Sequence, residues 1–118
     1  MNGRRLNNAV FAANIGIVAK AAAVAPRLGV TEASLLRGLG HGSGSSRALD
    51  GIAASGSVGG FTTTVAEFLG KDLAVVREVA ADLGADLGAL SAAHDVLARL
   101  LASDREDFLE AKSIPAAG

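Results

Sequence analysis

The longest apolar stretch of the chain constrains its fold most. It runs from Ala9 to Ala25 and is interrupted only by the polar residues Asn14 and Lys20. Its apolar side chains cover more than one face at helical spacing, which is typical of a helix enclosed by neighbouring elements. A membrane span needs about 20 clean apolar residues, and the stretch also lacks the cleavage pattern of a signal peptide. We therefore expect a long helix, from about residue 2 or 3 to Leu28, that is buried in protein.

Glycines and capping residues divide the next part of the chain. Thr31 is expected to cap a short second helix, and a third helix is expected over residues 47–54. Eight of the fifteen glycines lie between positions 38 and 60. This composition favours two flexible loops, at residues 41–46 and 55–64, on either side of the third helix.

Three further helices are expected after these loops. Apolar residues at helical spacing predict a fourth helix over about residues 68–83, ended by a glycine. Asp86 is expected to cap a fifth helix over residues 87–101. Ser103 and Glu106 have the spacing of a capping box, which predicts a separate last helix.

The predicted fold class is all-α. No segment shows a convincing two-residue alternation of apolar and polar side chains, which a half-buried strand would require. Half of the residues are hydrophobic, and most of these are small, which suits closely packed helices. We expect one domain of about six helices, built around the long first helix, over residues 1–112, followed by a flexible tail at residues 113–118.

Composition excludes several classes of function. Eleven basic and twelve acidic residues give a net charge of −1, so nothing attracts the chain to nucleic acid. There is no cysteine, which removes thiolate metal sites and is compatible with the cytoplasm, where we expect the protein to be. His41 and His94 lack a metal-ligand spacing. We interpret both as ordinary surface or loop histidines and expect no metal.

Four short motifs stand in a fixed order along the chain. They are Arg4-Arg5-Leu6-Asn7-Asn8, Gly42-Ser43-Gly44-Ser45-Ser46, Phe61 followed by Lys71-Asp72-Leu73, and Asp107-Phe108. Together they resemble the 3-hydroxyacid dehydrogenases, a family typified by 3-hydroxyisobutyrate dehydrogenase and similar to 6-phosphogluconate dehydrogenase. The first motif resembles the family's catalytic-helix pattern G-x-G-x-x-x-K-x-x-N-N, and the third resembles its K-D-L cofactor motif.

The resemblance implies the fold and the activity together. The fold would be that of the C-terminal helical domain of 6-phosphogluconate dehydrogenase. The activity would pass a hydride between NAD or NADP and a small 3-hydroxyacid or its carbonyl partner, in a homodimer. With Arg4 at the lysine position, the motif glycines and the dinucleotide-binding half would precede residue 1. No G-x-G-x-x-G in a β-α-β context occurs here. A domain cut at its first helix and a natural remnant both remain open, and we expect the chain alone to be inactive.

Arg4, Asn7 and Asn8 share one face of the first helix, because they recur at three- and four-residue steps. The resemblance gives Arg4 the place of the lysine that exchanges a proton with substrate, and gives Asn7 and Asn8 a part in binding it. An arginine keeps its proton near neutral pH, so Arg4 would bind a carboxylate or stabilise an oxyanion instead. An exposed arginine at a helix start, beside two asparagines bonded to backbone, is the alternative.

The other motifs supply the remaining candidate residues. The resemblance places Lys71, Asp72 and Phe61 near the cofactor, and it suggests Ser43 for substrate binding. An acidic residue at a helix start also explains Asp72 without a ligand, if the fourth helix begins there. The loop around Ser43 is suited either to anion binding through backbone N–H groups or to a plain connection.

Two other functions remain open. A non-catalytic helical interaction module would retain this fold, with Arg4 as the mark of a lost activity. An imine-reductase-like protein would use a different proton donor, although the Asn7-Asn8 pair argues mildly against it. Neither nucleic acid nor a membrane is an expected partner.

Overall fold

The structure is a computed structural model. It describes the backbone of residues 3–113 and the side chains of residues 3–65 and 69–102. The elements are α1 (Gly3–Val24), a 3-10 helix η1 (Ala25–Leu28), α2 (Glu32–Gly40), α3 (Arg47–Ser55), α4 (Val58–Leu83) and α5 (Ala89–Ser113). The described residues contain no strand, which confirms the all-α prediction. Of the predicted tail at residues 113–118, Ser113 is the last residue of α5, and residues 114–118 lie outside the described residues.

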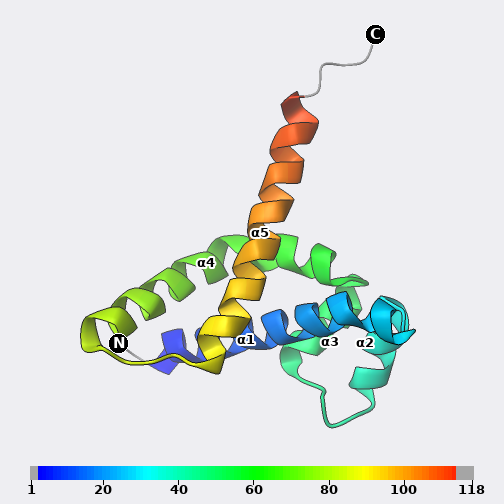
Figure 1. Cartoon of the computed structure of the whole chain (residues 1–118), viewed down its shortest axis with the longest axis horizontal. Coiled ribbons are helices and arrows are strands. Elements are labelled where there is room, and N and C mark those ends of the chain that lie inside the picture. The colour runs from blue at the N-terminus through cyan, green and yellow to red at the C-terminus, as the bar shows by residue number, and fades with distance from the viewer. Residues whose placement is uncertain (1–2, 114–118) are drawn as a thin grey trace.

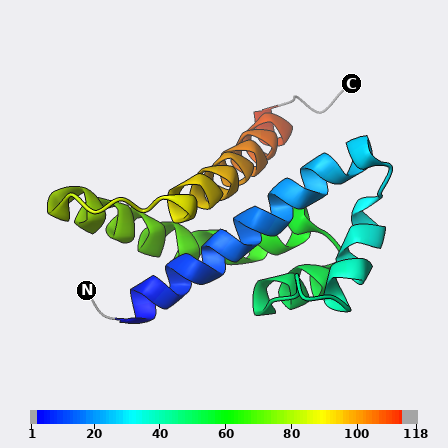
Figure 2. The ribbon, with the colours of Figure 1, turned by 60° about the horizontal axis from the view of Figure 1, so that its bottom comes forward.

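Helix α1 is the central element. It packs against α2, α3, α4 and α5, and Figure 2 shows it running between α5 on one side and α2 and α3 on the other. Residues 3–28 are long and apolar enough to cross a membrane, but the core helices of soluble proteins pass the same test. The buried face of α1 is made by Ala9, Ala12, Ala13, Ile15, Gly16, Val18 and Ala19.

A glycine allows α1 and α5 to approach each other closely. A methyl group added at Gly16 would overlap the backbone carbonyl of Ala93 on α5. The two helices cross there with backbone against backbone, and α5 then continues away from the other helices in Figure 1. The small side chains of the chain thus permit a helix crossing that larger ones would prevent.

The predicted boundaries of the first three helices are largely confirmed. The hydroxyl of Thr31 accepts a hydrogen bond from the Ser34 amide at 3.1 Å, and that of Ser46 accepts one from the Leu49 amide at 3.0 Å. The first helix changes from α to 3-10 geometry at Ala25, beside Pro26, and ends at Gly29 with φ +79°. A left-handed glycine of this kind is a common helix stop.

The predicted loop at residues 55–64 is wrong, because α4 begins at Val58. Ser57 caps the helix by accepting a hydrogen bond from the Gly60 amide at 3.0 Å. Val58 and Val65 are buried and hold the first turns on the core. This cap and this burial outweigh the helix-breaking tendency of two glycines, which costs about 1 kcal/mol each.

Two predictions about the last helices are also wrong. Asp86 is not the cap of α5. Its carboxylate accepts a hydrogen bond from the Gly88 amide at 2.8 Å within the preceding turn, and the helix begins at Ala89. No break occurs at Ser103, and α5 runs unbroken to Ser113. The segment has neither glycine nor proline, so nothing in it forces an end to the helix at the predicted capping box.

Candidate functional site

A polar contact between α1 and α4 joins two predicted site residues. The side-chain amide of Asn8 donates a hydrogen bond to the Asp72 carboxylate at 2.7 Å, although the two residues are 64 positions apart. Both side chains are half-buried. Among the described residues, no hydrogen bond engages the side-chain carbonyl oxygen of Asn8, and the contact with Asp72 fixes the direction in which this oxygen points. The first and third sequence motifs therefore meet in space.

Two basic residues stand beside this contact. Arg4 lies one helical turn before Asn8 on α1, and Lys71 immediately precedes Asp72 on α4; both side chains are exposed. Within the described part of the chain, Lys71 makes no ion pair or hydrogen bond. The prediction that Lys71 and Asp72 begin a helix is wrong, since they lie in the middle of α4. Asp72 therefore does not interact with the exposed N–H groups at the start of a helix. Its carboxylate holds the side chain of Asn8 instead.

Asn7 faces a different surface from Asn8. It lines a cleft between α1 and α3, together with Phe11, Asn14 and Arg47 among others. Consecutive helical residues point about 100° apart, so the Asn7-Asn8 pair divides between two sides of α1. The pair is not a single double-amide site.

Phe61 and Ser43 lie apart from the Asn8–Asp72 contact. The Phe61 ring packs edge-on against Phe11, with 6.3 Å between centroids and 77° between planes. It also lies against Gly51, where an added methyl group would strike it. Phe61 thus belongs to the edge of the core. Ser43 is exposed in the loop between α2 and α3.

His94 is a buried polar residue that the sequence interpretation missed. It is fully buried, not a surface or loop histidine, and its Nε2 atom lies 2.9 Å from the Ala9 carbonyl oxygen. This contact ties α5 to α1 one residue after Asn8. The signal for burial was present in the sequence, because His94 shares helical spacing with Leu90 and Leu97.

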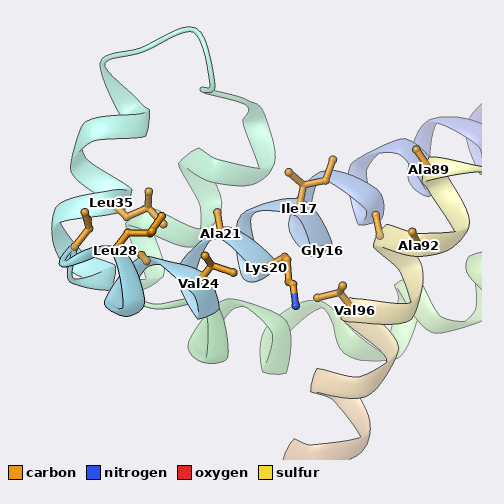
Figure 3. A pocket seen from close by; sticks show the side chains of 13 residues that line it. Gly16, Ile17, Lys20, Ala21, Val24, Leu28, Leu35, Ala89, Ala92 and Val96 are labelled. Atoms are coloured by element: carbon orange, nitrogen blue, oxygen red, sulfur yellow. The ribbon is translucent and has the colours of Figure 1, made fainter.

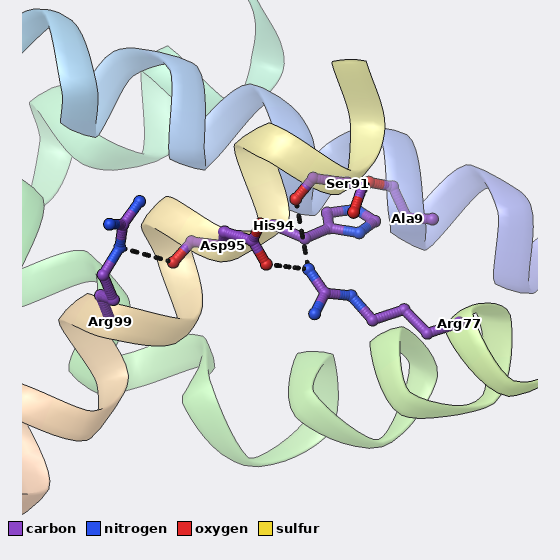
Figure 4. A network of polar contacts seen from close by, with 6 residues as sticks. All are labelled: Ala9, Arg77, Ser91, His94, Asp95 and Arg99. Atoms are coloured by element: carbon purple, nitrogen blue, oxygen red, sulfur yellow. Dashed lines mark hydrogen bonds and ion pairs between the residues drawn. The ribbon is translucent and has the colours of Figure 1, made fainter. Parts of the chain in front are cut away.

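A second set of polar contacts involves Asp95, the residue after His94 on α5. Arg77 of α4 forms an ion pair with Asp95 at 2.7 Å and donates a second hydrogen bond to the Ser91 carbonyl at 3.2 Å. Arg99 donates to the Asp95 carbonyl at 3.3 Å. Figure 4 shows the contacts of Arg77 linking α4 to α5, whereas the Arg99 contact lies within α5. Their partial exposure makes them modest contributors to stability.

The fold and contacts define an all-α domain whose first helix and fourth helix hold a polar site together. Residues 4–113 match the family described as the NAD-binding domain of NADP-dependent 3-hydroxyisobutyrate dehydrogenase. The chain therefore belongs to this family of NAD(P)-dependent dehydrogenase domains. No curated protein and no solved structure matches it.

Proposed function

We propose that the chain is the helical domain of an NAD(P)-dependent oxidoreductase that acts on a small 3-hydroxyacid or its carbonyl partner. It would work with a dinucleotide-binding domain. The observation that carries the proposal is the Asn8–Asp72 hydrogen bond. It unites the two motifs that resemble the catalytic helix and the cofactor motif of the family.

The polar groups suit this reaction in three ways. The free carbonyl oxygen of Asn8 accepts a hydrogen bond from a substrate hydroxyl, and Asp72 holds Asn8 in place. Arg4 stabilises negative charge that develops on the substrate oxygen. A bound nicotinamide dinucleotide would supply the hydride exchange, and the exposed cation of Lys71 would attract the phosphates of such a cofactor.

The test is an assay with the protein encoded by this sequence together with the sequence directly upstream of it. Reduction or oxidation of the nicotinamide is followed by absorbance with a panel of small 3-hydroxyacids and their carbonyl partners. Asn8→Ala should raise KM, and Asp72→Asn should have a smaller effect of the same kind. Failure of every acid with both NAD and NADP would contradict the proposal and favour a non-catalytic helical module.

We also propose that the chain forms a homodimer through α1 and its surroundings. A large apolar groove of about 620 Å³ lies along the second half of α1, bordered by η1, α2 and the first turns of α5. Figure 3 shows Ile17, Val24 and Leu28 along it, and their exposed fractions are 59%, 37% and 74%. Side chains this apolar favour a contact that removes them from water. A second copy offers the same surface, as a two-fold interface requires.

A further inference from the structure

The cleft between α1 and α3 is separate from the Asn8–Asp72 contact. Its volume is about 350 Å³, within the range of small-molecule sites, roughly 300 to 1,000 Å³. Helices α1 and α3 pack directly against each other, and the cleft opens along their contact. Its lining residues are Asn7, Val10, Phe11, Asn14, Arg47 and Ala48.

Three polar side chains converge on this cleft without partners of their own. Asn7 and Asn14 are two helical turns apart and so lie on the same side of α1. Arg47 faces them from the opposite helix. Among the described residues, no hydrogen bond or ion pair engages any of the three side chains. The five N–H groups of the guanidinium and the two of each amide are therefore available to a ligand.

Among the described residues, the cleft contains one positively charged side chain and no negatively charged one. Among the residues that the structure describes, Arg47 is the only charged one that lines it, and it is the first residue of α3. The start of a helix carries a partial positive charge, which adds to the attraction for an anion. The remaining lining residues, Val10, Phe11 and Ala48, are apolar and suit a short carbon skeleton.

We infer that this cleft binds the carboxylate of a small organic acid. Arg47 pairs with the carboxylate, the amides of Asn7 and Asn14 donate to its oxygens, and Val10 and Phe11 contact the carbon skeleton. A planar guanidinium matches the two oxygens of a carboxylate. A doubly charged phosphate would find only one compensating cation. The cleft lies on another side of α1 from Asn8, so the inference goes beyond the proposed function, and the binding needs no cofactor.

The experiment is an NMR titration of the ¹⁵N-labelled 118-residue chain. Isobutyrate is the probe, isobutyramide is its neutral analogue of the same shape, and inorganic phosphate is the competing anion. Isobutyrate should shift the side-chain signals of Asn7, Asn14 and Arg47, with a Kd on the order of 1 mM. Isobutyramide should leave them in place, and phosphate should shift them less at equal concentration.

Substitutions test whether isobutyrate binds in the cleft between α1 and α3. Arg47→Gln should lower the affinity for isobutyrate about tenfold or more, since it removes a charge-assisted pair. Arg47→Lys should bind isobutyrate with an affinity between those of the parent chain and Arg47→Gln. A lysine keeps the positive charge but lacks the paired N–H donors of the guanidinium. Arg27→Gln is the matched control, as Arg27 is exposed in η1 and outside the cleft, and it should bind isobutyrate like the parent chain. Circular dichroism confirms that each variant is folded.

Several outcomes would overturn the inference. One is unchanged affinity in Arg47→Gln, and another is an equal response to isobutyrate and phosphate. Absence of any shift at Asn14 and Arg47 also overturns it. If isobutyrate instead shifts Asn8 and Lys71, the cleft is rejected while the proposed function stands. If the cleft binds isobutyrate but the assembled enzyme oxidises no hydroxyacid, the proposed function fails alone.

Discussion

Asn7 and Asn8 are neighbours in the sequence that serve different surfaces of the molecule. Asn8 turns to α4 and is held by Asp72 at 2.7 Å. Asn7 turns to the cleft beside α3. A pair of identical residues in a motif thus supplies two distinct hydrogen-bonding positions, and substitutions at one should not reproduce the effects of the other.

Under the proposed function, Arg4 stands where the family resemblance expects a lysine. In the assembled enzyme, Arg4→Lys should increase turnover of a small 3-hydroxyacid, because a lysine can exchange a proton and a guanidinium cannot. General acid–base assistance is worth about 10²- to 10⁴-fold in rate. Arg4→Ala should lower residual activity. The measurement is a pH–rate profile of kcat for the three proteins, and identical profiles would show that this position takes no part in the chemistry.

His94 should stabilise the fold mainly by filling space. Its ring is fully buried, its Nε2 atom contacts the Ala9 carbonyl, and its Nδ1 atom has no hydrogen-bond partner among the described residues. His94→Ala should lower the free energy of unfolding by about 2–4 kcal/mol, through a cavity and a lost hydrogen bond. His94→Leu should cost only about 1 kcal/mol, since it restores the volume. Urea denaturation compares the two; equal losses would assign the effect to the hydrogen bond.

At the scale of elements, the crossing of α1 and α5 depends on a single glycine. Gly16→Ala should destabilise the chain by about 1–3 kcal/mol, because the new methyl group meets the Ala93 carbonyl and forces the helices apart. The gain in helix propensity, about 1 kcal/mol, is too small to compensate.

A second glycine provides the control for this prediction. Gly70 lies inside α4 with open space where a methyl group would stand. Gly70→Ala should therefore stabilise the chain by about 0.5–1 kcal/mol. Thermal unfolding followed by circular dichroism gives both values, and stabilisation by Gly16→Ala would show that the crossing tolerates more separation than the packing indicates.

The elements also show which features a sequence can predict. Thr31 and the left-handed Gly84 were recognised as boundaries because their signals act locally. The start of α4 was missed because Gly59 and Gly60 resemble a loop, and burial of Val58 against the core overrides that local tendency.

In the candidate site, too, local signals could be predicted from the sequence and the packing of helices could not. Helical spacing placed Arg4, Asn7 and Asn8 on one face, which is wrong for Asn7 because it lines the cleft beside α3. The family resemblance singled out Asp72. The contact between Asn8 and Asp72 depends on how α1 packs against α4, which no local pattern contains. The α1–α3 cleft was missed for the same reason, since Asn14 and Arg47 belong to no recognised motif.

At the scale of the whole molecule, cofactor binding should require more than this chain. The sequence has no G-x-G-x-x-G motif, and backbone cradles of that type are what hold a pyrophosphate. Calorimetric titration of the chain with NADPH and with NADH should give no micromolar affinity. Micromolar binding of either dinucleotide would mean that the helical domain alone recognises the cofactor.

The association of two copies should depend on the apolar groove along α1. Sedimentation at micromolar concentration should show roughly twice the chain mass of 11.7 kDa. Ile17→Glu should shift the chain to monomer, because an unpaired charge in an apolar interface is costly to bury. Leu83→Glu makes the same change at an exposed position outside the groove and should leave the dimer intact. A parent chain that sediments only as monomer, or equal dissociation by both variants, would contradict an interface at this groove.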